Sequence, residues 1–209
     1  MIVREGTAPI LVTTATAVLV QIMAGLPWAV APWLLVALLY WLYRLPRVAL
    51  IHDPLGVLSP LSGRVTGIAM ATDPFRDCPV LRIRLSLAPP GITLIRSPTE
   101  GKVLETYLRS GVLGTTLRPT PAAESPDCYA QSLRTDEGDE VLFAISSNWP
   151  VSRCTLDHAP GERAGQGQRA GFIYFASDCD VLVPPDSLAQ VTVGQRVSAG
   201  QTQLARLVH

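Results

Sequence analysis

The sequence predicts a mainly β, barrel-sandwich-hybrid-like domain preceded by an α-helical transmembrane hairpin. Two observations carry this prediction. No Asp, Glu, Lys or Arg occurs between Glu5 and Arg44. After Pro46, short β-branched and apolar runs are separated by Gly and Pro, which is typical of brief strands joined by turns. We therefore divide the 209 residues into a membrane anchor with two transmembrane helices, residues 1–47, and a β-rich domain, residues 48–209.

The uncharged segment is long enough to bend back on itself. A hydrocarbon core about 30 Å thick takes roughly 20 helical residues. Gly25, Pro27 and Pro32 predict the break, with one span at 8–25 and a second at 33–43 that includes part of its N-terminal flank. Trp and Tyr residues near the span ends are typical of anchors at the headgroup level.

Two other interpretations of this segment were weighed. A signal peptide cleaved after Ala31 would leave Pro32 directly behind the cut, and a second apolar segment follows at once. A buried helical pair in a water-soluble protein is disfavoured because wholly uncharged runs of this length are typical of membrane segments.

Positive charge flanks the hairpin and predicts its orientation. Arg4 precedes the first span, and Arg44 and Arg47 follow the second. The positive-inside rule then predicts that both ends of the hairpin and the C-terminal domain are cytoplasmic. We therefore expect a multi-pass protein of the cell inner membrane, in contact with membrane phospholipid. Lys plus Arg and Asp plus Glu each number 17, so net charge gives no reason to expect nucleic acid.

The cysteines predict neither a metal site nor a disulfide scaffold. Cys78, Cys128, Cys154 and Cys179 form no CxxC pair, and no His lies at metal-ligand spacing from them. Buried reduced thiols are the simpler interpretation.

Strict alternation at residues 80–87 predicts a half-buried strand. Arg82, Arg84 and Ser86 share one face, and leucines and an isoleucine share the other. Further strands are predicted at 92–95, 102–107, 141–146, 172–175, 181–183 and 191–193. Polar, Pro-rich or Gly-rich stretches predict loops at 118–127 and 157–168.

Three related turns predict the barrel-sandwich architecture. Residues 59–65 read Ser-Pro-Leu-Ser-Gly-Arg-Val, and residues 96–103 repeat the pattern as Arg-Ser-Pro-Thr-Glu-Gly-Lys-Val. Residues 194–200 form a Gly-x-x-Val-x-x-Gly turn of the kind found in lipoyl and biotinyl domains. Glycines permit positive φ at such tight reversals.

The order of these landmarks resembles a short bacterial phosphatidylserine decarboxylase along almost the whole chain. His52-Asp53-Pro54, the turn at 59–65, Gly-Ile-Thr-Leu-Ile-Arg-Ser-Pro at 91–98, and Gly-Phe-Ile-Tyr-Phe-Ala-Ser at 171–177 follow that family's sequence. The resemblance implies self-cleavage between Ala176 and Ser177, which converts the serine into a pyruvoyl group. That group bonds covalently to the substrate amine and accepts electrons as phosphatidylserine loses carbon dioxide to give phosphatidylethanolamine.

Three positions depart from the family pattern. Ser62 stands at the family's Asp position and Thr93 at its His position, and neither hydroxyl titrates near neutral pH. Ala176 replaces the glycine before the serine, and its Cβ restricts strained backbone conformations. The alternative function is therefore a catalytically inactive homologue acting as a lipid-binding or protein-interaction scaffold.

Other residues were considered as the missing base. The sequence offers three histidines, with four aspartates as orienting carboxylates: His52, His158 and His209, and Asp53, Asp157, Asp178 and Asp180. Their ordinary interpretation is a solvated loop residue for His158 and an interface residue for His52. For Ser177 the ordinary interpretation is a serine at a strand end.

Two binding roles complete the predictions. Anionic lipid would meet the arginines at positions 44, 47, 64, 82, 84 and 96, which are otherwise ordinary solvated residues. A barrel-sandwich module for protein contacts, as in membrane-fusion adaptors, predicts heptads that this chain lacks. A homo-oligomer or a homologous protein partner is compatible with the sequence.

Overall fold

The computed structural model describes residues 7–42, 53–87, 93–110, 127–147, 154–173 and 177–208. The chain divides into two compact units, Met1–Val48 and Ala49–His209.

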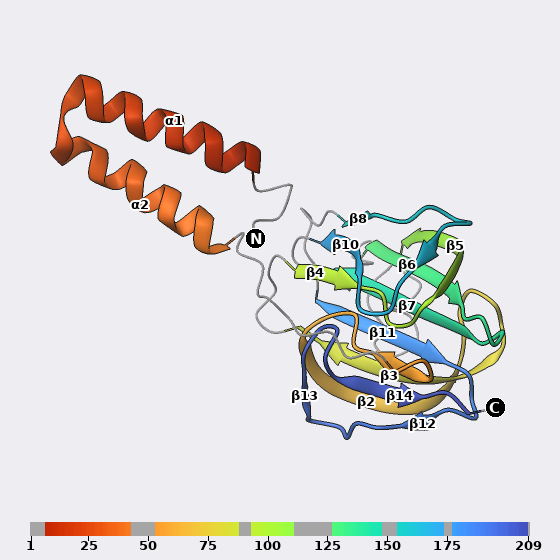
Figure 1. The fold of residues 1–209 in the computed structure, drawn as a ribbon. Helices are drawn as coiled ribbons and strands as arrows, with labels where there is room; N and C mark the ends of the chain where they lie inside the picture. Colours follow the sequence, from red (N-terminus) through yellow and green to blue (C-terminus); the bar gives the residue numbers. More distant parts are fainter. Residues whose placement is uncertain are drawn as a thin grey trace. The chain divides into compact units, whose positions relative to one another are not determined.

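The first unit contains an antiparallel helical hairpin, drawn in red and orange in Figure 1. Helix α1 spans Thr7–Ala24 and helix α2 spans Leu26–Leu42. Gly25 joins them with a φ of 81°, which a residue with a Cβ rarely adopts. The Trp33 indole N–H donates to the Gln21 side-chain oxygen at 3.0 Å and links the helices.

The helix boundaries correct part of the prediction. Pro32 lies inside α2 rather than in the break, so Gly25 alone separates the helices. In the part of the chain that the structure describes, no helix is both long enough and apolar enough to cross a membrane. The described helices therefore do not support the predicted transmembrane pair, and the multi-pass topology stays a prediction. The 17 residues of α2 extend about 26 Å, short of a hydrocarbon core about 30 Å thick, and the 18 residues of α1 include four threonines.

The second unit is built from strands, as predicted. Across its described residues the strands are β1 (Gly56–Leu58), β2 (Gly63–Thr72), β3 (Pro79–Ser86), β4 (Thr93–Arg96), β5 (Gly101–Ser110), β6 (Asp127–Arg134), β7 (Glu140–Ser147), β8 (Cys154–Leu156), β9 (Arg163–Ala164), β10 (Arg169–Ile173), β11 (Asp178–Val183), β12 (Leu188–Ala189), β13 (Arg196–Val197) and β14 (Gln203–Arg206). They form a curled large sheet in the order β13-β2-β3-β11-β7-β6-β5-β9 and two small sheets, β1-β14-β12 and β4-β10-β8 (Figure 1).

The large sheet has an internal pseudo-two-fold arrangement about its central pair, β11 and β7. Outward from that pair, β3, β2 and β13 on one side correspond to β6, β5 and β9 on the other. Strands β2 and β5 each have 10 residues, and β3 and β6 each have 8. Both outer hairpins bulge at the same place, between Val65 and Gly67 and between Val103 and Glu105. The small sheets are related in the same way.

The repeated turns predicted at 59–65 and 96–103 occupy equivalent positions in the two halves. The Ser59 hydroxyl donates to the Leu61 carbonyl at 2.6 Å, and the equivalent Ser97 hydroxyl donates to the Thr99 carbonyl at 2.8 Å. The turns also bond each other, because Leu58 N–H donates to Pro98 O at 2.7 Å and Arg96 N–H donates to Pro60 O at 3.0 Å.

Glycine is required where each turn enters its strand. A Cβ at Gly63 would lie 2.6 Å from the Ser86 carbonyl oxygen, and one at Gly101 would lie 2.3 Å from that of Arg134. Both distances are shorter than packed atoms tolerate, so the two glycines let neighbouring backbones approach.

The core lies between the large sheet and the small sheets. Leu81, Ile83, Leu85 and Leu87 are buried in it, which confirms the inward face predicted from alternation. A second, smaller apolar cluster lies on the opposite face, where Phe75 and Tyr107 stack with ring centroids 4.8 Å apart.

Most predicted strands are confirmed. Residues 191–193 lie outside any strand, and the predicted loop at 157–168 contains β9. Strands β1, β6, β8, β12, β13 and β14 were not predicted. The predicted loop at 118–127 lies outside the described residues except for Asp127, which begins β6.

Candidate active site

Ser177 lies directly before β11, and its backbone is held from both sides. Its N–H donates to the Ser146 carbonyl oxygen on β7 at 3.0 Å. Its carbonyl oxygen accepts from the Leu87 N–H, just after β3, at 2.8 Å. The residue is half-buried. These bonds continue the β3-β11-β7 pairing by one residue and fix the backbone of Ser177, whereas Ala176 lies outside the described residues.

Ser62 precedes β2 at the same end of the large sheet. Its exposed hydroxyl oxygen accepts from the Ala199 N–H at 2.9 Å. Strand β3 lies between β2 and β11, since Ser86 pairs with both Arg64 and Asp178. Adjacent strands are about 4.8 Å apart, so β2 runs about 10 Å from the strand that Ser177 enters. Ser62 therefore fixes the turn at 198–202, in the neighbourhood of Ser177.

Thr93 lies on a different sheet. It begins β4 and pairs with Ile173, the last residue of β10. Ile173 precedes Ser177 by four positions in the sequence, and the intervening residues lie outside the described ranges. The structure thus brings the backbones of Ser62 and Ser177 to the same end of the large sheet. Thr93 lies on a small sheet, where it pairs with β10, the strand that precedes Ser177 in the sequence.

A polar row crosses the outer face of the sheet beside Ser177. Arg64, Ser86, Asp178 and Ser146 occupy successive paired positions on β2, β3, β11 and β7. In the next row inward, Arg84 donates to both carboxylate oxygens of Asp180, with Nε–Oδ1 at 2.7 Å and Nη2–Oδ2 at 2.6 Å. Those hydrogen bonds raise the pKa of the Arg84 guanidinium, and the Asp178 charge contributes. Arg84 therefore carries a positive charge close to the Ser177 end of β11.

Comparison with known proteins identifies the family. The family model described as phosphatidylserine decarboxylase matches residues 53–205. This chain belongs to the phosphatidylserine decarboxylase family. The match spans nearly all of the β-rich unit, from before β1 to the last strand.

Full-length relatives agree with that assignment. The chain is 31% identical over 207 residues to a phosphatidylserine decarboxylase proenzyme of Aromatoleum aromaticum, covering 99% of this chain and 96% of the relative. It is 31% identical over 205 residues to the enzyme of the same name from Nitrosomonas eutropha, covering 98% and 94%. The Burkholderia pseudomallei proenzyme is also 31% identical, over 207 residues that cover 99% and 95%. No solved structure gives a significant match.

Phosphatidylserine decarboxylases are proenzymes that depend on a pyruvoyl group, and the surroundings of Ser177 fit one. Such a group keeps the carbonyl of its parent serine and loses the nitrogen. At residue 177 that carbonyl oxygen already accepts from the Leu87 N–H. The half-buried position limits access of water to a reactive carbonyl without closing the site.

Among the described candidates for the missing base and its orienting carboxylate, Asp157 and Asp180 are paired with arginines. Asp157 accepts from Arg169 Nε at 2.6 Å, and the His158 backbone oxygen accepts from Gln131. Asp180 is committed to Arg84. His52 and His209 lie outside the described residues. Asp178, directly after Ser177, keeps the position predicted for it beside the serine.

The contacts that hold Ser177 come from groups that the sequence did not reveal. They are the Ser146 carbonyl and the Leu87 N–H, and Ala199 contributes the N–H that holds Ser62. Backbone groups carry no side-chain signature. Only the glycines at 194 and 200, which indicated a turn, signalled the Ala199 contact.

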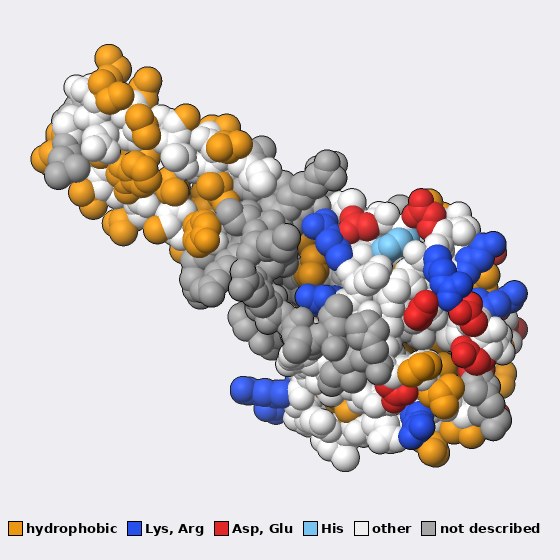
Figure 2. Space-filling view, in the orientation of Figure 1, with side chains coloured by type: hydrophobic (Ala, Val, Ile, Leu, Met, Phe, Trp, Pro, Cys, Tyr) orange, Lys and Arg blue, Asp and Glu red, His pale blue; other side chains and the backbone are white. Residues whose placement is uncertain are grey.

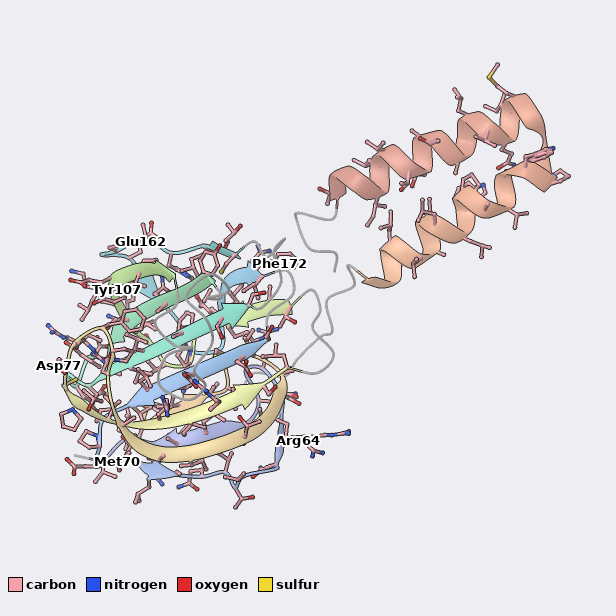
Figure 3. All side chains as sticks on the ribbon, turned by 180° about the vertical axis from the view of Figure 1, so that it is seen from behind. Arg64, Met70, Asp77, Tyr107, Glu162 and Phe172 are labelled. Atoms are coloured by element: carbon pink, nitrogen blue, oxygen red, sulfur yellow. The ribbon has the colours of Figure 1, made fainter. Side chains whose placement is uncertain are left out.

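The predicted arginine set divides by environment. Arg84 is paired with Asp180, and Arg96 donates to Gly167 O at 2.8 Å, with burial lowering the pKa of its guanidinium. Arg64 is exposed, and the stick view in Figure 3 shows its side chain pointing away from the domain. Arg44 and Arg47 lie outside the described residues. Within the described ranges, no three His, Cys, Asp or Glu side chains gather as a metal site, and Cys78, Cys154 and Cys179 are thiols rather than disulfide partners.

Proposed function

We propose that this chain is a phosphatidylserine decarboxylase that matures by cleavage between Ala176 and Ser177 and converts phosphatidylserine to phosphatidylethanolamine. The family match supports the reaction class, and the observation that carries the proposal is the backbone clamp on Ser177. Backbone bonds to β3 and β7 fix the position of Ser177, and a nucleophile in a fixed position favours an intramolecular attack.

In the proposed maturation, the Ser177 hydroxyl oxygen attacks the Ala176 carbonyl carbon and passes its proton to a base. The C–N bond then breaks, and an ester replaces the amide. β-Elimination then breaks the bond between the Ser177 Cβ and the ester oxygen, which releases Ala176 with a free carboxylate and leaves dehydroalanine at residue 177. The imine tautomer of dehydroalanine takes up one water molecule and releases ammonia, and the pyruvoyl group remains at residue 177. The bond from Ser177 N–H to Ser146 O is lost with the nitrogen, whereas the Leu87 N–H keeps its acceptor. When present, the pyruvoyl group supplies a carbonyl that accepts electrons from the substrate as carbon dioxide leaves.

Maturation is proposed to be slow, because neither Ser62 nor Thr93 carries a group that accepts a proton near neutral pH. The Ser62 hydroxyl oxygen is also engaged by Ala199 N–H at 2.9 Å. General acid–base help contributes on the order of 10² to 10⁴ in rate, so its absence lengthens maturation by about that factor.

The second candidate is an inactive homologue that binds lipid or acts as an interaction scaffold. The engagement of Ser62 in a structural turn favours it, since that contact serves folding without supplying a base. This candidate predicts a chain that stays intact, with no turnover of phosphatidylserine.

Denaturing electrophoresis with intact-mass spectrometry distinguishes the two. The proposal predicts a fragment ending at Ala176 and a small chain with a blocked, pyruvoyl-type N-terminus. A Ser177→Ala variant is the control and stays intact. A wild-type chain that remains intact after prolonged incubation with phosphatidylserine vesicles, with no phosphatidylethanolamine formed, refutes the decarboxylase and leaves the scaffold.

Lipid contact is proposed to occur through the helical hairpin. Residues 7–42 contain no charged side chain, and large apolar residues on both helices are exposed, including Ile22 at 79%, Met23 at 81% and Trp28 at 73%. Exposed apolar surface of this extent marks an interaction site, and membrane phospholipid is the proposed partner. The cytoplasmic orientation stays a prediction, because Arg4, Arg44 and Arg47 lie outside the described residues.

We also propose that the β-rich unit is a duplicated barrel-sandwich hybrid. The paired turns and the palindromic strand order support that description. This symmetry lies within one chain and does not bear on the oligomeric state. Hydrodynamic measurement would show whether the protein forms a homo-oligomer or binds a homologous partner.

A further inference from the structure

Two arginines face each other at the outer end of the polar row. Arg64 on β2 and Arg196 on β13 are direct cross-strand partners, and both are exposed. Side chains at such positions have Cβ atoms about 5 Å apart, where like charges destabilise the pairing. Within the described ranges, neither guanidinium lies within 4.0 Å of a carboxylate, because the ion pairs there involve Arg76, Arg84, Arg134, Arg163 and Arg169.

The other half of the domain contains the same cationic pair with its charge compensated. Lys102 on β5 and Arg163 on β9 are the pseudo-symmetric partners of Arg64 and Arg196. There, Arg163 pairs with Glu100 at 3.2 Å and with Asp136. The residue equivalent to Glu100 is Ser62, since each lies directly before the glycine that begins its strand. Replacement of a carboxylate by a hydroxyl thus leaves the Arg64 and Arg196 pair without its counter-charge.

The uncompensated pair lies at the Ser177 end of the large sheet, on its outer face. Arg64 pairs with Ser86, and Ser86 pairs with Asp178, which follows Ser177. Figure 2 shows basic side chains projecting from the domain on the side where Figure 1 draws β13. An anion that lies between two like charges removes their repulsion. This arginine pair therefore has the chemistry of a phosphate-binding site.

We propose that Arg64 and Arg196 bind a phosphate group, either the phosphodiester of a phospholipid headgroup or a free phosphate ion. The lipid source rests on the proposed function. Two guanidinium groups offer paired N–H donors to phosphate oxygens, and the Ser86 hydroxyl lies in the same row.

Isothermal titration calorimetry of the full chain in a neutral detergent tests this site. The titrants are glycerophosphoserine, which carries the phosphodiester without acyl chains, and inorganic phosphate. All proteins carry Ser177→Ala, so that neither cleavage nor turnover contributes and binding is measured apart from the proposed reaction. Arg64→Gln and Arg196→Gln are each expected to weaken binding about tenfold, because each removes charge-assisted hydrogen bonds.

Lys102→Gln is the matched control, since it removes the equivalent exposed cation from the other half of the domain. It is expected to change affinity by less than about twofold. Arg64→Lys keeps the charge and is expected to retain most of the binding, and circular dichroism checks that every variant is folded.

Three results are distinguishable. Weaker glycerophosphoserine binding in both arginine variants, with the Lys102 control unchanged, supports the headgroup phosphodiester. The same pattern with inorganic phosphate alone supports a free-phosphate site and overturns the lipid part. Equal effects in all three variants, or no binding of either titrant, overturn the site itself, whatever the cleavage experiment shows for Ser177.

Discussion

Replacement of Asp180 by Asn measures how strongly the Arg84–Asp180 pair stabilises the centre of the large sheet. The Asp180 side chain is 2% exposed, and it accepts two hydrogen bonds from Arg84 across the β3–β11 pair. Asparagine keeps the shape but loses the charge and turns an NH₂ group toward the guanidinium. Breaking a buried pair costs about 3–5 kcal/mol. Because Arg84 is 21% exposed and water can solvate part of it, we expect about 3 kcal/mol.

Thermal unfolding of the full chain in detergent, followed by circular dichroism, checks this value. One kcal/mol shifts Tm by about 2–4 °C in a unit of this size, so Asp180→Asn is expected to lower Tm by about 6–12 °C. The control is Asp136→Asn, which removes the partner of Arg163 where both side chains are more than half exposed. A surface pair contributes less than about 1 kcal/mol. Equal Tm shifts in the two variants would refute the assignment of Asp180 to a buried structural pair.

Two further outcomes are expected. A Ser62→Asp, Thr93→His double variant restores titratable groups, so cleavage before Ser177 is expected to accelerate by about 10² to 10⁴, measured by a gel time course; an unchanged rate would contradict the residue matching. Burial, with the hydrogen bond to Glu105, raises the pKa of Tyr107 to about 12. The folded state therefore holds this proton longer than the unfolded state, and stability is expected to fall between about pH 10 and pH 12, an effect that Tyr107→Phe removes in urea titrations.

The periodicity of apolar residues predicted the elements that have one buried face and one solvent-exposed face. Strand β3 shows why, because its leucines point into the core while Arg82 and Arg84 face outward. The repeated turns were equally visible, since Gly63 and Gly101 are required by close backbone contacts. In both cases a local residue pattern reflects a local physical requirement.

The elements that were missed have no such pattern. Strand β6 mixes Gln131 and Ser132 with apolar residues, and both polar side chains are buried between neighbouring strands. Strands β9, β12 and β13 have only two residues each, too few to show alternation. Pro32 was expected to end a helix, yet α2 continues through it. Residues 191–193 contain two valines, yet the Gln195 side chain bonds the Thr192 N–H at 3.0 Å and forms a turn.

For the candidate site, the sequence indicated the proposed reacting residue but not the groups that hold it. Ser177 was predicted from a family motif, whereas Ser146 and Leu87 contact it through backbone groups only. The identity of a residue does not encode where its carbonyl or N–H points. That information requires the pairing of strands far apart in the chain.

The duplication explains why the site lies at one end of the sheet and not at the other. In the second half, β6 and β7 are joined by a tight turn in which Thr135 N–H donates to Asp139 O at 2.9 Å and Gly138 has a φ of 100°. The equivalent bond in the first half joins Leu87 N–H to Ser177 O at 2.8 Å, but those residues are 90 positions apart in the sequence. The same backbone hydrogen bond therefore closes the β6–β7 hairpin in the second half. In the first half it joins β3 to β11, a strand that is distant in the sequence. In the first half, the peptide bond before Ser177 precedes the start of the β3–β11 pairing. The proposed cleavage at that bond would therefore leave β3 and β11 paired, whereas the hairpin of the second half offers no equivalent position.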